Sequence, residues 1–312
     1  GMLDASHAIK WLICVFFSSK KAFPCLSLFG DKSSAEIKFK LFDFLIIGNV
    51  VGRTGRNALQ NNLKKIKTKF SIDFTIINGE NSAGGYGITG KIYEDMVSWG
   101  ADAITLGNHA WKQEEIITYM KDNPDHNIIR PINFTEDSPG QGCKIFTHSN
   151  GERILVSQVH GKTFIDLPLS NPFEAIDTKL LSIINDHQIN YSFLEVHAEV
   201  TSEKNGIAQN YDGKFTAIYG THVHIPTMDA RVLDKGTCFQ TDIGMTGDYN
   251  SVIGMKKENA IKRMRAESNT PRLEPAEGEA TISGAIITAN KGQKSTIQSI
   301  QIGGVLDRNL LS

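Results

Sequence analysis

Residues 101–106 (ADAITL), followed directly by Gly107-Asn108-His109, decide the fold class of this chain. The run is short, apolar and bounded by Gly100 and Gly107, which predicts a strand buried in a parallel sheet. In open α/β sheets, ligands bind at the carboxyl ends of the strands. We therefore expect Asn108 and His109 to lie at a functional edge of the sheet.

The same alternation of apolar strand and amphipathic helix continues along the chain. This alternation indicates an α/β fold in which mostly parallel strands are covered by helices. The C-terminal runs 281–289 and 296–302, joined by a turn near Lys291-Gly292, add an antiparallel portion, and 130–142 is a loop. We predict further strands over 41–47, 72–77, 154–159, 191–196, 215–219 and 238–241, and helices over 56–70, after the glycine loop 84–90, and over 113–121, 173–185 and 259–267.

Composition limits the compartment and the partners. The chain is 40% hydrophobic and 21% charged, with a net charge of −1, which is ordinary for a soluble globular protein. No global field attracts nucleic acid or an anionic membrane, so an anionic substrate would have to be held locally. The scattered Cys14, Cys25, Cys143 and Cys238 form no CxxC pair, which favours a reducing cytoplasm over a disulfide framework or a zinc ribbon.

The first forty residues differ from the rest. Residues 11–17 (WLICVFF) are far shorter than the roughly 20 apolar residues of a membrane span, and no clean signal cleavage site follows them. We therefore expect no membrane segment. We interpret residues 1–40 as a non-catalytic extension, a mis-assigned start or residues of cloning origin; the last is suggested by Gly1 before Met2.

Polar side chains of one chemical kind follow five of the predicted strands. Because parallel strands bring their carboxyl ends to one edge, we expect these side chains to converge. Imidazole, amide and carboxylate groups suit Fe, Mn or Zn rather than Ca or a thiolate cluster. A single histidine at a strand end is usually solvated, but five such ends favour a metal site. The candidates are Asn49, Glu80, Asn81, Asn108, His109, His197, His222 and His224.

The spacing of the histidines adds detail. His222 and His224 are two residues apart, so in extended backbone both would project to one side, which suits two adjacent ions. His160 ends a strand and is assigned at most a supporting role. The remaining histidines lie in polar or terminal surroundings and are expected to be solvated: His7, His126, His148 and His187.

Two glycine-rich loops suggest other functions. Residues 85–90 (GYGITG) match the GxGxxG pattern between a strand and a helix. However, Glu80 stands where a pyrophosphate would approach and no acidic residue ends the next strand, so a dinucleotide-dependent oxidoreductase is disfavoured. Residues 48–55 precede a helix and could bind an anion there. No GxSxG elbow or P-loop is present to support a serine hydrolase or a nucleoside triphosphatase.

Longer motifs carry a family resemblance. INGENSAGGYGIT (77–89), GADAITLGNHAW (100–111), RPINF (130–134), HAEVTSEK (197–204) and TDIGMTGDYNSVIGM (241–255) resemble the YmdB family of bacterial cyclic-nucleotide phosphodiesterases. This family is a branch of the calcineurin-like metallophosphoesterases. The resemblance covers about residues 42–305 and implies a four-layer α/β sandwich, with residues 41–312 as the metallophosphoesterase domain and a dinuclear metal centre at the strand edge.

The resemblance also implies a role for each candidate. Glu80 would bridge two divalent ions, Fe or Mn before Zn or Mg, and His109 would face the scissile phosphate as general acid. A bridging carboxylate keeps two cations about 3.5–4 Å apart, close enough to share a hydroxide for in-line attack. The first ion would be held by Asn49 and His224 with Asn81 nearby, and the second by Asn108, His197 and His222.

We therefore expect a metal-dependent hydrolase, a phosphodiesterase acting on small phosphodiesters such as 2′,3′- or 3′,5′-cyclic nucleotides. RNA is a less favoured substrate because the chain is nearly neutral. We also expect a homo-oligomer.

One residue departs from the family pattern. The family has Asp in the first motif, where this chain has Asn49. An amide oxygen brings no charge, so we hypothesise weaker binding of the first metal. The alternative function that follows is a metal- or nucleotide-binding regulatory protein with weakened catalysis.

Overall fold

The computed structural model describes residues 41–289 and 294–311. The predicted extension 1–40 and the predicted turn at Lys291-Gly292 lie outside the described residues. Within the described part, no helix is long and apolar enough to cross a membrane.

The larger sheet has eight strands in the order β2-β12-β13-β1-β3-β4-β5, with β14 paired to β13. Strands β1, β3, β4 and β5 are parallel to one another, whereas β13 is antiparallel to β1, β12 and β14. The strands are β1 (Phe42–Ile47), β2 (Asn49–Val50), β3 (Phe74–Asn78), β4 (Ala103–Thr105), β5 (Ile128–Ile129), β12 (Met245–Asp248), β13 (Ala280–Ala289) and β14 (Thr296–Ile302).

The smaller sheet has six strands in the order β10-β11-β9-β8-β7-β6. Its four central strands are parallel, and its two edge strands are antiparallel to their neighbours. The strands are β6 (Cys143–Thr147), β7 (Arg153–His160), β8 (Tyr191–His197), β9 (Ala217–Thr221), β10 (Arg231–Val232) and β11 (Cys238–Gln240).

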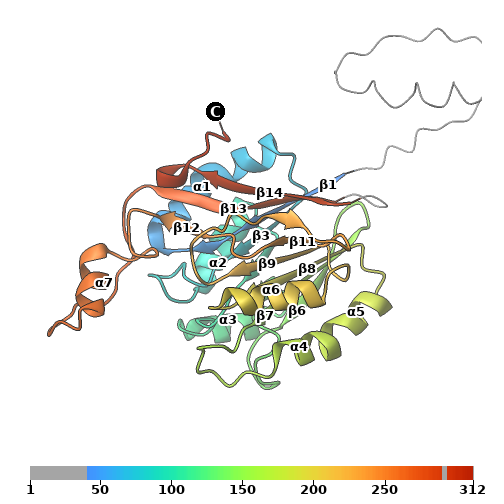
Figure 1. The fold of residues 1–312 in the computed structure, drawn as a ribbon, viewed down its shortest axis with the longest axis horizontal. Coiled ribbons are helices and arrows are strands. Elements are labelled where there is room, and N and C mark those ends of the chain that lie inside the picture. Colours follow the sequence, from blue (N-terminus) through green and yellow to red (C-terminus); the bar gives the residue numbers. More distant parts are fainter. Residues whose placement is uncertain (1–40, 290–293, 312) are drawn as a thin grey trace, which may run out of the picture. The chain divides into compact units, whose positions relative to one another are not determined.

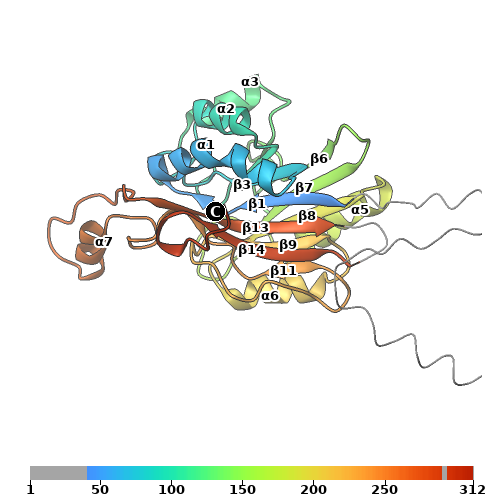
Figure 2. The same ribbon diagram turned by 90° about the horizontal axis from the view of Figure 1, so that it is seen from above.

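Helices cover the outer faces of both sheets (Figure 2). Helices α1 (Gly52–Lys69), α2 (Gly90–Trp99) and α3 (Glu115–Asp122) lie over the larger sheet. The smaller sheet is covered by α4 (Pro172–Ala175), a π-helical turn (Ile176–Leu180), α5 (Leu181–Asp186) and α6 (Thr201–Asn210). Helix α7 (Lys257–Met264) stands apart on a protruding segment (Figure 1), and a 3₁₀ turn spans Gly304–Leu306.

Three hydrophobic cores separate the four layers. In β1, Phe44 and Ile46 face the core between the sheets, where they meet Phe193, while Leu45 and Ile47 face the helices of the larger sheet. A third core lies between the smaller sheet and its helices. A strand buried on both faces explains the continuous apolar run from which it was predicted. The predicted α/β sandwich, with mostly parallel strands and an antiparallel portion, is confirmed.

Some elements escape the sequence patterns. Strands β6 and β12 and helix α6 were not predicted, and the predicted helix 173–185 is interrupted by the π-helical turn. Helix α6 buries Lys204 beside Ile207 and Ala208, so a charged residue interrupts the apolar face by which helices are recognised. Helix α1 begins at Gly52, four residues before the predicted start at residue 56.

Candidate metal centre

The structure brings all eight candidate side chains together at one edge, where the two sheets meet. Glu80 and Asn81 follow β3, Asn108 and His109 follow β4, His197 ends β8, and His222 and His224 follow β9. Asn49 begins the two-residue strand β2, which pairs with β12. The convergence follows from the parallel arrangement of β3 with β4 and of β8 with β9.

The centre of the cluster is a set of atoms that all accept hydrogen bonds or bind metals. His197 Nε2 lies 3.0 Å from Glu80 Oε2, 3.0 Å from Asn108 Oδ1 and 3.2 Å from His222 Nδ1. Ligand atoms of Glu80, His197 and His222 all lie within 4.8 Å of one another. Such a convergence of carboxylate, amide oxygen and imidazole nitrogens fits a borderline divalent cation.

A buried network orients His197. Thr221 Oγ1 donates its proton to Glu195 Oε1 at 2.7 Å and lies 2.8 Å from His197 Nδ1. Since the hydroxyl proton is already used, Thr221 accepts the Nδ1–H of His197. In this tautomer, Nε2 presents its lone pair to the cluster. Metal-binding histidines are commonly oriented by an outer hydrogen bond of this kind.

The charge of the cluster resides on Glu80, which is fully buried. Burial by itself would raise the pKa of Glu80. The positive charge that His197, His109 and His222 carry when protonated outweighs that effect and holds the pKa of Glu80 below its ordinary value. Glu80 is therefore a buried carboxylate that needs a positive partner.

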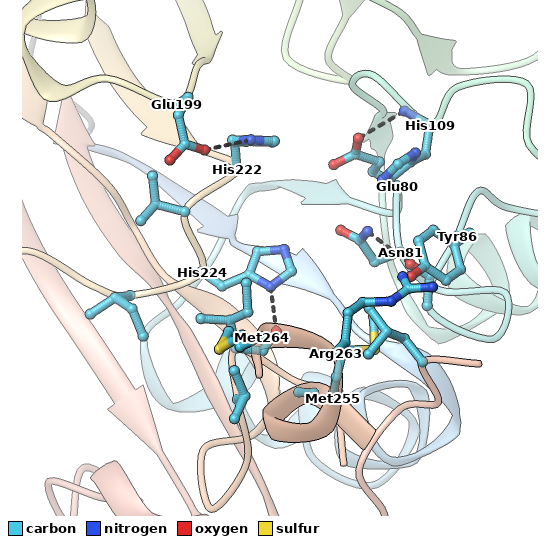
Figure 3. A pocket seen from close by; sticks show the side chains of 17 residues that line it. Glu80, Asn81, Tyr86, His109, Glu199, His222, His224, Met255, Arg263 and Met264 are labelled. Carbon is cyan, nitrogen blue, oxygen red and sulfur yellow. Dashed lines mark hydrogen bonds and ion pairs between the residues drawn. The ribbon is translucent and has the colours of Figure 1, made fainter. Parts of the chain in front are cut away.

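The two histidines after β9 reach the site by a different backbone from the one predicted. His222 has φ of 94° and His224 has φ of 71°, so the backbone is left-handed rather than extended. The prediction that extended backbone aligns them is wrong, although both line the same cavity (Figure 3). Left-handed backbone costs non-glycine residues on the order of 1–3 kcal/mol and clusters at functional sites.

His224 is also held in one tautomer. Its Nδ1 lies 2.8 Å from the carbonyl oxygen of Ile253, which can only accept, so Nδ1 carries the proton. The lone pair of Nε2 is then free for a ligand. Burial, opposed by the hydrogen bond to Ile253, lowers the pKa of His224.

Asn49 behaves differently from the other candidates. Its amino group lies 3.1 Å from Glu80 Oε2, 3.1 Å from Asn81 Oδ1 and 3.2 Å from Asn78 Oδ1. Its amide oxygen accepts a 3.2 Å hydrogen bond from the backbone N–H of His222. These partners define the orientation, because a flipped amide would oppose like groups on both sides. In this arrangement Asn49 donates to the ligand residues and does not offer them its oxygen.

His109 lies beside the cluster and lines the cavity. Its backbone N–H donates to Glu80 Oε1 at 2.9 Å, and its ring stands edge-on to Tyr86, with centroids 5.2 Å apart. Its Nε2 lies 3.3 Å from Asn108 Nδ2. Burial, partly opposed by the carboxylate of Glu80, lowers the pKa of His109.

His160 and His126 lie outside the cluster, and the sequence also supports a prediction for each. His160 is buried behind His197, with ring centroids 5.2 Å apart, and its Nδ1 donates to the carbonyl of Gly161 at 2.6 Å. Burial lowers its pKa to about 4. The prediction that His126 is solvated is wrong, because it is buried and its Nδ1 accepts the N–H of Ile128 at 3.1 Å.

Several supporting residues carry weak signals or none in the sequence. Glu195, a charged residue inside the apolar strand β8, also accepts hydrogen bonds from Asn78 Nδ2 at 2.6 Å and Gln158 Nε2 at 2.8 Å. A carboxylate within a strand buried on both faces is the signal that could have identified it. Glu199, whose Oε2 lies 3.0 Å from His222 Nε2, carried no such signal because it is half-exposed in a loop.

A glycine is also required at the centre. A Cβ at Gly107 would collide with His197 Nε2 and Glu80 Oε1. The chain that leaves β4 can therefore pass the cluster only without a side chain at this position.

The cluster forms one wall of a cavity of about 480 Å³ (Figure 3). Glu80, His109, His222 and His224 line that wall, together with residues of the glycine loop, and the opposite wall comes from residues 252–273. The predicted glycine loop thus borders the cluster. The volume falls within the range of roughly 300–1,000 Å³ typical of small-molecule sites.

Comparison with known proteins identifies the family of this chain. The family model described as "YmdB-like protein" matches residues 45–301. The 2′,3′-cyclic-nucleotide 2′-phosphodiesterase of Bacillus subtilis (strain 168) is 42% identical over 255 residues, which cover 81% of this chain and 94% of that protein.

Two solved structures show the same fold. The crystal structure of a hypothetical protein from Thermus thermophilus has a TM-score of 0.75 and 35% identity, covering 83% of this chain and 99% of that one. The crystal structure of a novel phosphatase from Mycoplasma pneumoniae has a TM-score of 0.76 and 31% identity, covering 85% and 94%.

The fold is therefore of the phosphatase type, with a candidate metal centre at the carboxyl edge of its strands. More particularly, the chain belongs to the YmdB-like protein family, as its motifs predict.

Proposed function

We propose that this protein is a metal-dependent phosphodiesterase that hydrolyses small cyclic nucleotides, 2′,3′-cyclic monophosphates first and 3′,5′-cyclic monophosphates as the alternative. The observation that carries the proposal is the convergence of Glu80, Asn108 and His222 on His197 Nε2, a set of acceptors that a cation would satisfy. The named activity of the Bacillus subtilis relative supports the substrate class.

The residue roles follow from the predicted ligand sets. Asn108, His197 and His222 would hold one ion, which Glu80 shares with a second ion. On the other side, His224 offers Nε2 and Asn81 lies beside Glu80, while Asn49 would have to rotate its amide to become a ligand. That orientation supports the hypothesis of a weaker first site.

The chemistry divides between the ions and the side chains. Two divalent cations, when bound, would supply a nucleophile from water at neutral pH and neutralise the phosphoryl oxygens. His109 would donate the proton to the departing oxygen, which is worth about 10²–10⁴ in rate. The hydrogen bond from the backbone N–H of His109 to Glu80 and the edge-on contact with Tyr86 hold the ring at the cavity wall.

Elemental analysis and a phosphodiester panel test the proposal together. Chelation should abolish hydrolysis of 2′,3′-cyclic AMP, and Fe or Mn should restore it more fully than Zn or Mg. Chelated protein that keeps its activity would contradict metal dependence. Metal-loaded protein that hydrolyses no phosphodiester would contradict the function.

A second function has one observation in its favour. The donor orientation of Asn49 fits a protein that binds metal or nucleotide but has weakened catalysis, that is, a regulatory protein. Tight nucleotide binding without turnover at full metal loading would favour it. The cytoplasmic location and the homo-oligomeric state predicted from the sequence stay predictions.

A further inference from the structure

The wall of the cavity opposite the metal centre is apolar and belongs to one segment, residues 252–273, which carries α7 (Figure 3). Among its lining residues only Arg263 is polar. The others are Val252, Ile253, Met255, Ala260, Met264 and Leu273. A ligand whose phosphate lies at the metal centre would extend directly onto this wall.

Part of this wall consists of large apolar side chains that are exposed to solvent. Met264 is 74% exposed and Ile253 is 50% exposed, whereas Met255 and Ala260 are buried and attach the segment to the rest of the fold. Apolar side chains gathered at the rim of a cavity commonly mark a binding surface.

Arg263 is also without an ion pair among the described residues, whereas two other cationic side chains of the same segment are paired. Arg265 Nε lies 2.9 Å from Glu267 Oε1, and Lys256 Nζ lies 3.0 Å from Glu274 Oε2. Figure 3 shows the Arg263 side chain extending from α7 toward the side of the cavity that holds Tyr86. A planar guanidinium in this position can stack on a flat aromatic ligand.

We propose that the α7 segment is the subsite for the nucleobase of the substrate, with Arg263 and Met264 contacting the face of the base. This inference rests on the proposed phosphodiesterase function and names the part of the chain that makes a nucleotide a better substrate than a bare phosphodiester. Stacking on apolar and guanidinium surfaces needs no particular base, because every base has a π-face.

The composition of the wall also predicts its selectivity. Apart from the guanidinium of Arg263, which the proposal places on the face of the base, residues 252–273 contribute no side chain with a hydrogen-bonding group to the cavity, so this wall offers no paired donor and acceptor for the edge of a base. Hydrophobic pockets discriminate weakly between ligands of similar shape, whereas dedicated hydrogen bonds discriminate strongly. We therefore expect the enzyme to accept all four bases while rejecting a substrate that lacks one.

The experiment compares 2′,3′-cyclic AMP and 2′,3′-cyclic CMP with methyl riboside 2′,3′-cyclic phosphate, which has no base. For the protein with its natural sequence, kcat/KM should be about 10- to 100-fold higher for both nucleotides than for the base-free substrate. Arg263→Ala and Met264→Ser should each raise KM for the nucleotides several-fold, and leave KM for the base-free substrate and the metal content unchanged.

Matched controls come from the same chain. Arg265→Ala removes an arginine two positions away that does not line the cavity, and Met228→Ser alters a methionine that is 87% exposed elsewhere. Both should behave as the natural protein does. Equal kcat/KM with and without the base, or equal effects of test and control variants, would overturn the inference. It would also be overturned if Met264→Ser changed only the oligomeric state in light scattering, since the wall would then be a contact between copies.

A binding measurement separates this inference from the proposed function. Calorimetry with 3′-AMP and with inorganic phosphate reports the subsite without turnover. If no substrate is hydrolysed but 3′-AMP binds more tightly than phosphate and Arg263→Ala removes the difference, the subsite stands and the proposed function fails. If substrates are hydrolysed but the base adds nothing to binding, the function stands and the subsite fails.

Discussion

The two halves of the candidate metal centre share Glu80 but are built differently. On one side, His197 is oriented through Thr221 and the buried Glu195, and three further ligand atoms converge on its Nε2. On the other side, the amino group of Asn49 points at Glu80 and a neighbouring amide oxygen. The first half consists of acceptors that need a cation, whereas the second already contains a neutral donor.

This difference shows how a single amide can change a site without changing its shape. An aspartate at position 49 would add a negative charge and an acceptor where the asparagine places N–H groups. The side chains would occupy nearly the same volume, but the attraction for a cation would differ. Substitutions at four positions should distinguish the two halves.

Removing the carboxylate of Glu80, which both halves share, should abolish metal binding in both. Glu80→Gln replaces the buried anion with a neutral amide, so bound metal should be lost and activity should fall to that of chelated protein. Elemental analysis and the rate with 2′,3′-cyclic AMP measure this. Glu199→Gln is the comparison, since that carboxylate also touches His222 but is half-exposed, and it should retain most of the metal. Retained metal in Glu80→Gln would exclude a bridging role.

Substitution of His109 should lower turnover without changing metal binding on either side of Glu80. His109→Asn is expected to lower kcat by roughly 10²–10⁴ and to leave metal content unchanged, because the proposed role is proton donation. The loss should shrink for a p-nitrophenyl ester, whose leaving group needs no proton. A parallel loss of metal would mean that His109 is a ligand.

The hydrogen bonds that orient His197 should contribute to metal affinity, and this contribution can be measured separately. Thr221→Val keeps the shape but removes the hydroxyl that links His197 to Glu195, and metal affinity should fall about 10- to 100-fold. A competitive chelator titration measures the affinity. Thr221→Ser restores a hydroxyl and should recover most of it. Equal affinity in all three proteins would show that the link is dispensable.

One added negative charge should strengthen metal binding in the half that contains Asn49. Asn49→Asp is expected to raise the number of metal ions bound per chain and to increase the phosphodiesterase rate modestly, because a carboxylate would add a charged member to the predicted ligand set of the first ion. Elemental analysis after dialysis against limiting metal gives the stoichiometry. Equal metal content and equal rates in the two proteins would remove the basis for distinguishing the halves.

Sequence patterns were sufficient for the frame of the site. Strands such as β1, β3 and β8 are buried on both faces, so their residues form apolar runs that end sharply at the ligand residues. The parallel order then places those ends on one edge. The same patterns failed for α6, whose buried Lys204 interrupts the apolar face, and for the backbone at His222.

The sequence by itself determined which side chains gather and what chemistry they offer, because residue type and position at a strand end are local properties. Only the tertiary structure decided how they are presented. The Asn49 amide is oriented by the backbone of His222, 173 positions away, and the proton of His197 by Thr221. These orientations depend on contacts between distant strands, which no local pattern records.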